Sequence, residues 1–326
     1  MRKISMIFIV ILMLCVACEK PEEDRFGKFR EIAERIEKER VEESEQTKEE
    51  AVQSINTDVK PEAEKQEWIE EVDTGYVSFY DGELGTAGSL RGKTLIVSIF
   101  ASDRSTSWDF QNQECQNTMN DTLQDMTVAT AWLSEQASKY QTAATFVYDW
   151  KADPDLKYAA VFQEQLVRSG GEMYDVQRDY IERNIDTEGL RNKYQADNVI
   201  YFFFFNTDYD NQVNPWTLGY SSAKHCTIEF VNLYVKFDDF YDSYPATYVH
   251  EILHTFGAPD LYYANEMISQ AYVDYCAKIN SNDIMYTVIS GDKITNAFTE
   301  LDAYYVGLVD SSDEVVKWKL GKSEHK

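Results

Sequence analysis

The sequence predicts an α+β domain built on a mixed, mainly parallel twisted sheet. Short apolar runs rich in β-branched and aromatic residues are typical of buried strands, and helical patterns separate them. A chain that alternates strands with helices forms mainly parallel pairs. Hydrophobic residues make up 44% of the 326 residues, which is enough for a buried core. The predicted elements are, in order, strand Lys93–Phe100, helix Val128–Tyr140, strand Ala144–Tyr148, helices Phe162–Arg168 and Val176–Tyr194, and strand Asn198–Phe205.

The first residues predict an export signal. Arg2 and Lys3 precede the apolar run Ile4–Ala17, which is too short to span a bilayer comfortably and is typical of a signal peptide over residues 1–17. The run ends in Leu-Cys-Val-Ala-Cys, which resembles a bacterial lipobox with Cys18 as the modified residue. Lipidation of Cys18 would hold the protein to the outer face of a bacterial membrane. The alternative is an ordinary secretory signal ending near Ala17.

A charged tether is predicted to follow. Residues 18–66 are dominated by Glu and Lys and cannot bury enough apolar surface to fold. From Trp68 the composition becomes globular, which places one domain at 67–326. The formal charge of −26 becomes −28 once Arg2 and Lys3 are removed with the signal, since −26 − 2 = −28. Such a surface repels phosphates, so no nucleic-acid partner is expected.

A metal-binding motif lies in the second half of the chain. His250, Glu251, His254, Gly257 and Asp260 fit the pattern H-E-x-x-H-x-x-G-x-x-D. Residues four apart on a helix lie one above the other, so the two histidines can present imidazoles to one ion. The glutamate stands where a general base is placed in H-E-x-x-H proteases.

The residues around the motif favour a helix that ends at a sharp turn. Pro245 suits a first helical turn, and Gly257 can take the left-handed conformation that stops a helix. Asp260 can then return as a third ligand. The alternative is an ordinary amphipathic helix whose histidines are solvated. The apolar face of the predicted helix comprises Val249, Ile252, Leu253 and Phe256.

The segment Asn282–Tyr286 reads N-D-I-M-Y, and with the motif above it resembles the metzincin clan of zinc endopeptidases. The aspartate in third place is similar to the snapalysin-type and immune-inhibitor-A-type members. The resemblance implies His250, His254 and Asp260 as zinc ligands, Glu251 as the base, and Met285 as the methionine of the turn beneath the metal. Some metzincins place a metal-associated tyrosine two residues after that methionine, where this chain has Thr287. Tyr286, Tyr262 and Tyr263 are other candidates for a hydroxyl at the site.

The resemblance also implies a cleft and a substrate. The cleft would lie between 67–256 and 257–326. Two further strands are predicted, at Thr217–Ser221 and Thr227–Val235. The resemblance implies that an antiparallel edge strand, either Thr217–Ser221 or Thr227–Tyr234, binds extended peptide. A closing helix is expected at Phe298–Val309. The implied function is a secreted, membrane-tethered zinc endopeptidase acting on proteins or peptides. Two rivals are a non-catalytic surface lipoprotein that binds a peptide, protein or glycan, and a metal-dependent amidase acting on cell-wall peptides.

Other candidates are weaker. Glu266 resembles a thermolysin-type ligand but follows His254 by only twelve residues. Asn206–Asn211 has alternating oxygen ligands that resemble part of a calcium loop, without the glycine and distal glutamate of an EF-hand. A polar surface loop is the preferred interpretation. Cys115, Cys226 and Cys276 allow one disulfide at most, so no disulfide scaffold is expected.

Overall fold

The computed structural model describes residues 9–10, 87–163, 166, 172–207, 218–219, 228–238, 241–264 and 268–321. Six described strands form one sheet, in the order β3-β2-β5-β7-β6 with β4 also paired to β2. The pairs are parallel except for β6 with β7, which are antiparallel. The predicted α+β class with a mainly parallel sheet is confirmed. The strands are β2 (Gly92–Ser102), β3 (Ala144–Val147), β4 (Lys157–Val161), β5 (Asn198–Phe205), β6 (Leu218–Gly219) and β7 (Phe230–Tyr234).

The central strand β5 is buried on both faces. Alternate residues of a strand point to opposite faces, and here both faces of the aromatic run are covered. Phe202 and Phe204 contact Tyr248 of α5 (Pro245–Thr255), with ring centroids 6.0 and 6.2 Å apart. Phe203 contacts Tyr180 on the other face, at 6.2 Å. This double burial explains why β5 is apolar at nearly every position.

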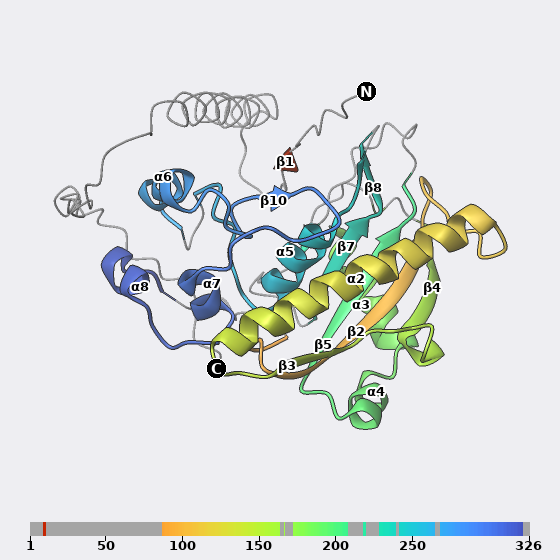
Figure 1. Ribbon diagram of the computed structural model, residues 1–326. Helices are drawn as coiled ribbons and strands as arrows, with labels where there is room; N and C mark the ends of the chain where they lie inside the picture. The colour runs from red at the N-terminus through yellow and green to blue at the C-terminus, as the bar shows by residue number, and fades with distance from the viewer. Residues whose placement is uncertain are drawn as a thin grey trace, which may run out of the picture. The chain divides into compact units, whose positions relative to one another are not determined.

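Helices form layers on the two faces of the sheet. The long helix α2 (Gln113–Lys139) crosses one face and lies beside α5 (Figure 1). Helices α3 (Glu172–Asn184) and α4 (Thr187–Tyr194) follow on the other face, where Thr187 hydrogen-bonds the Tyr201 hydroxyl at 2.6 Å.

Several predicted boundaries were wrong. The helix predicted at Val128–Tyr140 begins at Gln113, where Asn112 caps it by accepting two backbone amides. The helix predicted at Val176–Tyr194 is broken at Asp186, whose side chain caps α4 instead. A helix predicted at Phe162–Arg168 is not found at its described residues 162, 163 and 166, because the chain has just left strand β4.

The chain after β7 is mostly irregular. Its described residues contain a short hairpin, four helices and a two-residue strand, β10, that pairs antiparallel with Ile9–Val10. The predicted closing helix is shorter than expected and begins at Glu300 because Thr299 and Asp302 form a capping box. In Figure 1 the last three helices lie together at one side of the sheet. The remaining elements are β1 (Ile9–Val10), η1 (Pro154–Leu156), β8 (Lys236–Asp238), β9 (Tyr241–Asp242), α6 (Gln270–Ile279), β10 (Val288–Ile289), α7 (Glu300–Tyr305) and α8 (Asp313–Trp318).

Several sequence-based predictions concern residues outside the described part of the chain. Apart from Ile9–Val10, these include the signal peptide, Cys18 and the tether. Of the strand predicted at Thr217–Ser221, the structure describes Leu218–Gly219, which is an antiparallel strand at the end of the sheet order. Within the described ranges, no helix has the length and hydrophobicity needed to cross a membrane.

Candidate metal centre

Helix α5 carries most of the site and is held by packing. All of its residues are buried, and Pro245 occupies the first turn as predicted. Its N-cap residue, Tyr244, makes no capping hydrogen bond with its side chain. Burial against the sheet through residues such as Tyr248 therefore has to stabilise this short helix, because isolated helices of this length are marginal in water.

The end of α5 follows from a glycine. Gly257 has a φ of 102°, a conformation that favours glycine. The Gly257 amide donates to the His254 carbonyl at 2.8 Å, and the Ala258 amide donates to the Leu253 carbonyl at 3.0 Å. This pair of bonds is a Schellman motif, which satisfies the last carbonyls of the helix and reverses the chain. The reversal brings Asp260 back toward the histidines.

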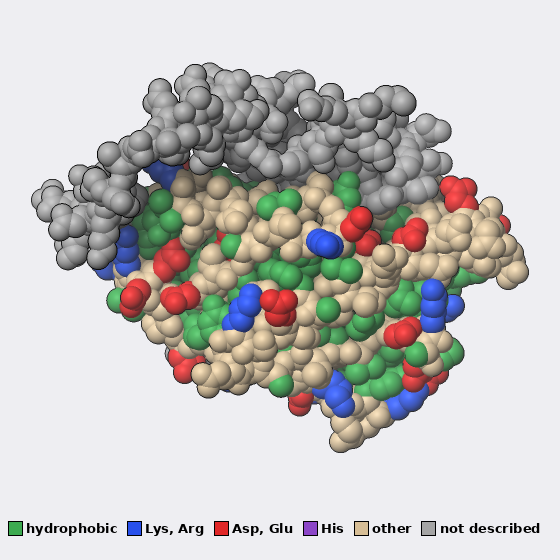
Figure 2. Space-filling view, in the orientation of Figure 1, with side chains coloured by type: hydrophobic (Ala, Val, Ile, Leu, Met, Phe, Trp, Pro, Cys, Tyr) green, Lys and Arg blue, Asp and Glu red, His purple; other side chains and the backbone are tan. Residues whose placement is uncertain are grey.

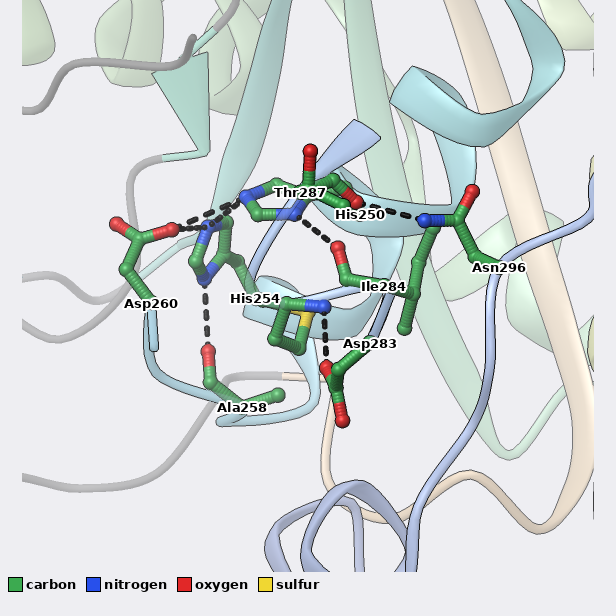
Figure 3. A network of polar contacts seen from close by, with 9 residues as sticks. His250, His254, Ala258, Asp260, Asp283, Ile284, Thr287 and Asn296 are labelled. Atoms are coloured by element: carbon green, nitrogen blue, oxygen red, sulfur yellow. Dashed lines mark hydrogen bonds and ion pairs between the residues drawn. The ribbon is translucent and has the colours of Figure 1, made fainter. Parts of the chain in front are cut away.

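Three donor atoms from these residues meet at one point (Figure 3). The Nε2 atoms of His250 and His254 are 3.0 Å apart. The Asp260 Oδ1 atom lies 3.1 Å from the first and 3.2 Å from the second. Among the described residues, His250, His254 and Asp260 form the group of three or more histidine, cysteine or acidic side chains that could hold a metal ion.

Backbone carbonyls orient both imidazoles. His250 Nδ1 donates to the Ile284 carbonyl at 2.8 Å, and His254 Nδ1 donates to the Ala258 carbonyl at 2.7 Å. Since a carbonyl oxygen only accepts, each Nδ1 carries a proton, which leaves each Nε2 as the ring atom available to a metal ion. A second partner of this kind fixes the tautomer and ring orientation of metal-binding histidines.

The donor set fits a metal ion held by three protein ligands. Ligand atoms placed tetrahedrally at about 2.0 Å from zinc are about 3.3 Å apart, close to the three separations observed. All three side chains are at most 2% exposed. Two neutral imidazoles and one carboxylate are a donor set that zinc accepts, and three protein ligands leave a fourth position open.

The electrostatics of the group favour a cation. Burial by itself lowers the pKa of His254, but the charges of Asp260 and Glu251 and the bond to the Ala258 carbonyl together raise that pKa to about 9. Burial would raise the pKa of Asp260, yet the two histidines hold it below its ordinary value. A carboxylate that favours positive charge on its neighbours to this extent also favours a metal cation between them.

Glu251 and Tyr262 complete the surroundings. Glu251 follows His250 on α5, is completely buried, and its charge contributes to raising the pKa of His254. The Tyr262 ring stacks on the His250 ring, with centroids 6.4 Å apart. Burial and the Asp260 charge raise the Tyr262 pKa well above its ordinary value, so this hydroxyl keeps its proton.

The Asn282–Tyr286 turn lies next to the histidines. Met285 is completely buried, and its carbonyl accepts the Leu261 amide at 2.9 Å, which ties the turn to the segment that carries Asp260. The Ile284 carbonyl of the same turn is the acceptor for His250. The turn therefore contributes backbone atoms to the site.

Among the secondary candidates that the structure describes, Cys115, Cys276 and Asn206 do not join this group. Cys115 and Cys276 are both free thiols, and Asn206 donates to the Ser107 carbonyl at 3.0 Å. The residues Asp208–Asn211, Cys226 and Glu266 lie outside the described residues. On the face drawn in Figure 2 no described histidine is visible, in agreement with the burial of the two ligands.

Two acids and two backbone acceptors near the site were not predicted from the sequence. The acceptors are the carbonyls of Ala258 and Ile284, which no side-chain pattern indicates. The acids are Asp283, which belongs to the turn, and Asp302, which lies in α7, and both are buried. The spacing of Thr299 and Asp302 is that of a capping box and would have indicated a helix start there.

Comparison with known proteins gives no further guidance, because the chain matches no protein-family model and no curated protein matches its sequence.

Proposed function

We propose that the protein is a secreted, membrane-tethered zinc endopeptidase of metzincin type. The observation that carries this proposal is the convergence of His250 Nε2, His254 Nε2 and Asp260 Oδ1, next to the buried carboxylate of Glu251. The export signal and lipidation of Cys18 rest on the sequence alone and belong to the same proposal.

The residues have distinct parts in the reaction. His250, His254 and Asp260 would hold the zinc, which when bound supplies Lewis-acid activation of water and of the scissile carbonyl. Glu251 accepts a proton from the attacking water and returns it to the leaving amine. The Nδ1 bonds to backbone carbonyls keep both imidazoles in the tautomer that the site needs.

The sheet edge gives a place for substrate backbone. Strand β6 is antiparallel to β7, lies at the end of the sheet order and is next to α5. An edge strand accepts an extended peptide as one more strand, since its free amides and carbonyls are the binding groups. This position supports a protein or peptide substrate.

Replacing Glu251 by alanine tests the proposed chemistry. We expect Glu251→Ala to abolish hydrolysis of unfolded protein substrates, because the base is lost, while zinc content stays at the wild-type level. The measurements are peptide release and metal content on the same preparation. Normal hydrolysis by this variant would remove Glu251 from its assigned role.

The same assays separate the rival functions. A folded wild-type protein that binds zinc but cleaves neither proteins nor peptides would favour the non-catalytic binding lipoprotein. Cleavage of purified cell-wall peptides without cleavage of unfolded proteins would favour the amidase. A binding protein has no use for a buried general base, and this is why the presence of Glu251 favours an enzyme.

A further inference from the structure

Two buried acids outside the metal-binding group support the turn that orients His250. Asp283 belongs to the turn and is 0% exposed, and Asp302 lies in α7 and is 1% exposed. Their carboxyl groups lie within interaction range of each other. Neither acid has a part in the chemistry proposed above.

The contact between the two acids requires a proton. Asp283 Oδ1 accepts the Met285 amide at 2.7 Å. Asp283 Oδ2 is buried and makes no hydrogen bond of ordinary geometry with a described group, although the Thr299 hydroxyl also interacts with this carboxyl. Two ionised carboxylates are acceptors only and would repel each other. With a proton on the Asp302 carboxyl, the same contact becomes a hydrogen bond that satisfies the Asp283 oxygen.

We propose that Asp283 and Asp302 share one proton and form a positioning pair, which ties α7 to the turn and thereby fixes the Ile284 carbonyl that orients His250. The proposal rests on the metal site of the proposed function, but it does not require that the protein cleaves peptides. The two acids act through the turn and do not touch the metal-binding atoms.

A short chain of bonds connects the pair to the histidine. Asp302 Oδ2 accepts the Thr299 amide at 2.8 Å, which fixes the carboxyl at the start of α7. The Asp283 carboxyl binds the Met285 amide, and this amide belongs to the same peptide group as the carbonyl of Ile284. That carbonyl lies 2.8 Å from His250 Nδ1 (Figure 3).

Backbone bonds make the turn rigid enough to transmit this support. The amides of Tyr286 and Thr287 both donate to the Asp283 carbonyl, at 3.1 and 2.9 Å. The Ile284 amide donates to the Ala297 carbonyl at 2.9 Å, and the Asn296 side chain donates to the Thr287 carbonyl at 2.7 Å. A shift of the Asp283 side chain would disturb these bonds together.

The charges around the pair favour the shared proton. Among the described residues, the titratable groups that interact with it include Cys276 on α6 and Tyr140 at the end of α2. Burial raises the pKa of both groups, so both are neutral at neutral pH and neither balances a second negative charge. Glu314 and Glu300, which interact with these two groups, add negative charge to the region. Burial raises the pKa of each acid of the pair as well.

The test compares zinc affinity among variants of the full chain, measured by competition with a chelator. We expect Asp302→Ala to weaken zinc binding about 10- to 100-fold, the usual effect of losing an outer partner of a ligand. Asp302→Asn should bind zinc nearly as well as the wild type, because its amide can donate to Asp283. Glu300→Gln is the matched control, since it removes an exposed charge from the same helix and should change nothing.

A folded Asp302→Ala protein with wild-type zinc affinity would overturn the proposal. A second measurement covers the case in which this variant does not fold. Unfolding of the metal-free wild type at pH 7 should release about one proton more than unfolding of Asp302→Asn, because the folded pair holds one proton and the unfolded acids hold none. Equal proton release would also overturn the proposal. Neither readout depends on peptide hydrolysis, so a failed peptidase assay would leave this proposal standing.

Discussion

Helix α5 and the irregular chain that follows it build the metal site together, but they contribute different chemistry. The helix supplies side chains, namely two imidazoles and the Glu251 carboxylate. The irregular chain supplies one carboxylate, Asp260, and the two carbonyls of Ala258 and Ile284. The helical period thus explains which ligands come together, whereas the turns explain how the ligands are oriented.

The two regions are also stabilised differently. Helix α5 is buried throughout and packs on the aromatic face of β5, so its position follows from hydrophobic burial. The irregular chain is held by backbone hydrogen bonds, such as that from the Leu261 amide to the Met285 carbonyl at 2.9 Å. Substitutions that change either a side chain or the backbone conformation therefore test this comparison.

The largest effect is expected from a ligand of the helix. His254→Ala should weaken zinc binding by more than the 10- to 100-fold that loss of an outer partner costs, because one of three ligands is lost. Thr247→Val on the same helix is the control. The Thr247 hydroxyl is buried and has no hydrogen-bond partner among the described residues, so its replacement by a methyl group should leave zinc binding unchanged and stability equal or higher. Equal zinc affinity in His254→Ala and the wild type would exclude this histidine as a ligand.

An intermediate effect is expected from the glycine at the junction of the two regions. Gly257→Ala should lower the free energy of unfolding by about 1–3 kcal/mol, because an alanine with positive φ is strained. Zinc affinity should fall as well, since the same turn carries the Ala258 acceptor and leads to Asp260.

Gly291→Ala is the matched control for this strain. Gly291 also has a positive φ, 138°, and a Cβ there would meet nothing within 4 Å. Its replacement should lower stability, measured by denaturant unfolding, without changing zinc affinity. A loss of affinity in both glycine variants would mean that the turn after α5 has no specific part in the site.

The smallest effect is expected from the methionine of the turn. Met285 contributes its amide to Asp283 and its carbonyl to Leu261, and both are backbone groups. Met285→Leu conserves volume and should cost less than about 1.5 kcal/mol of stability, with zinc affinity retained. A large loss of zinc affinity in a stable Met285→Leu protein would show that the thioether itself matters.

The same contrast explains what the sequence could predict. The buried strands and the helical histidine pair were predictable because periodicity and apolar runs show in side chains, as in Asn198–Phe205. The carbonyls of Ala258 and Ile284 were not, since every residue has a carbonyl and only the fold selects which one is used. The polar first half of α2 lacks a clear apolar pattern, and Asp186 ended a helix that periodicity alone would continue. Asp302 was missed because its partner Asp283 is distant in sequence.

The zinc content of the purified full chain, beside that of Asp260→Ala, tests the central claim most directly. The account predicts one tightly held zinc per wild-type chain and its loss or loosening in the variant, because Asp260 Oδ1 lies 3.1 and 3.2 Å from the two Nε2 atoms. A folded wild type that takes up no zinc would contradict the metal site and the enzyme built on it. Unchanged zinc affinity in Asp260→Ala would mean that another residue is the third ligand.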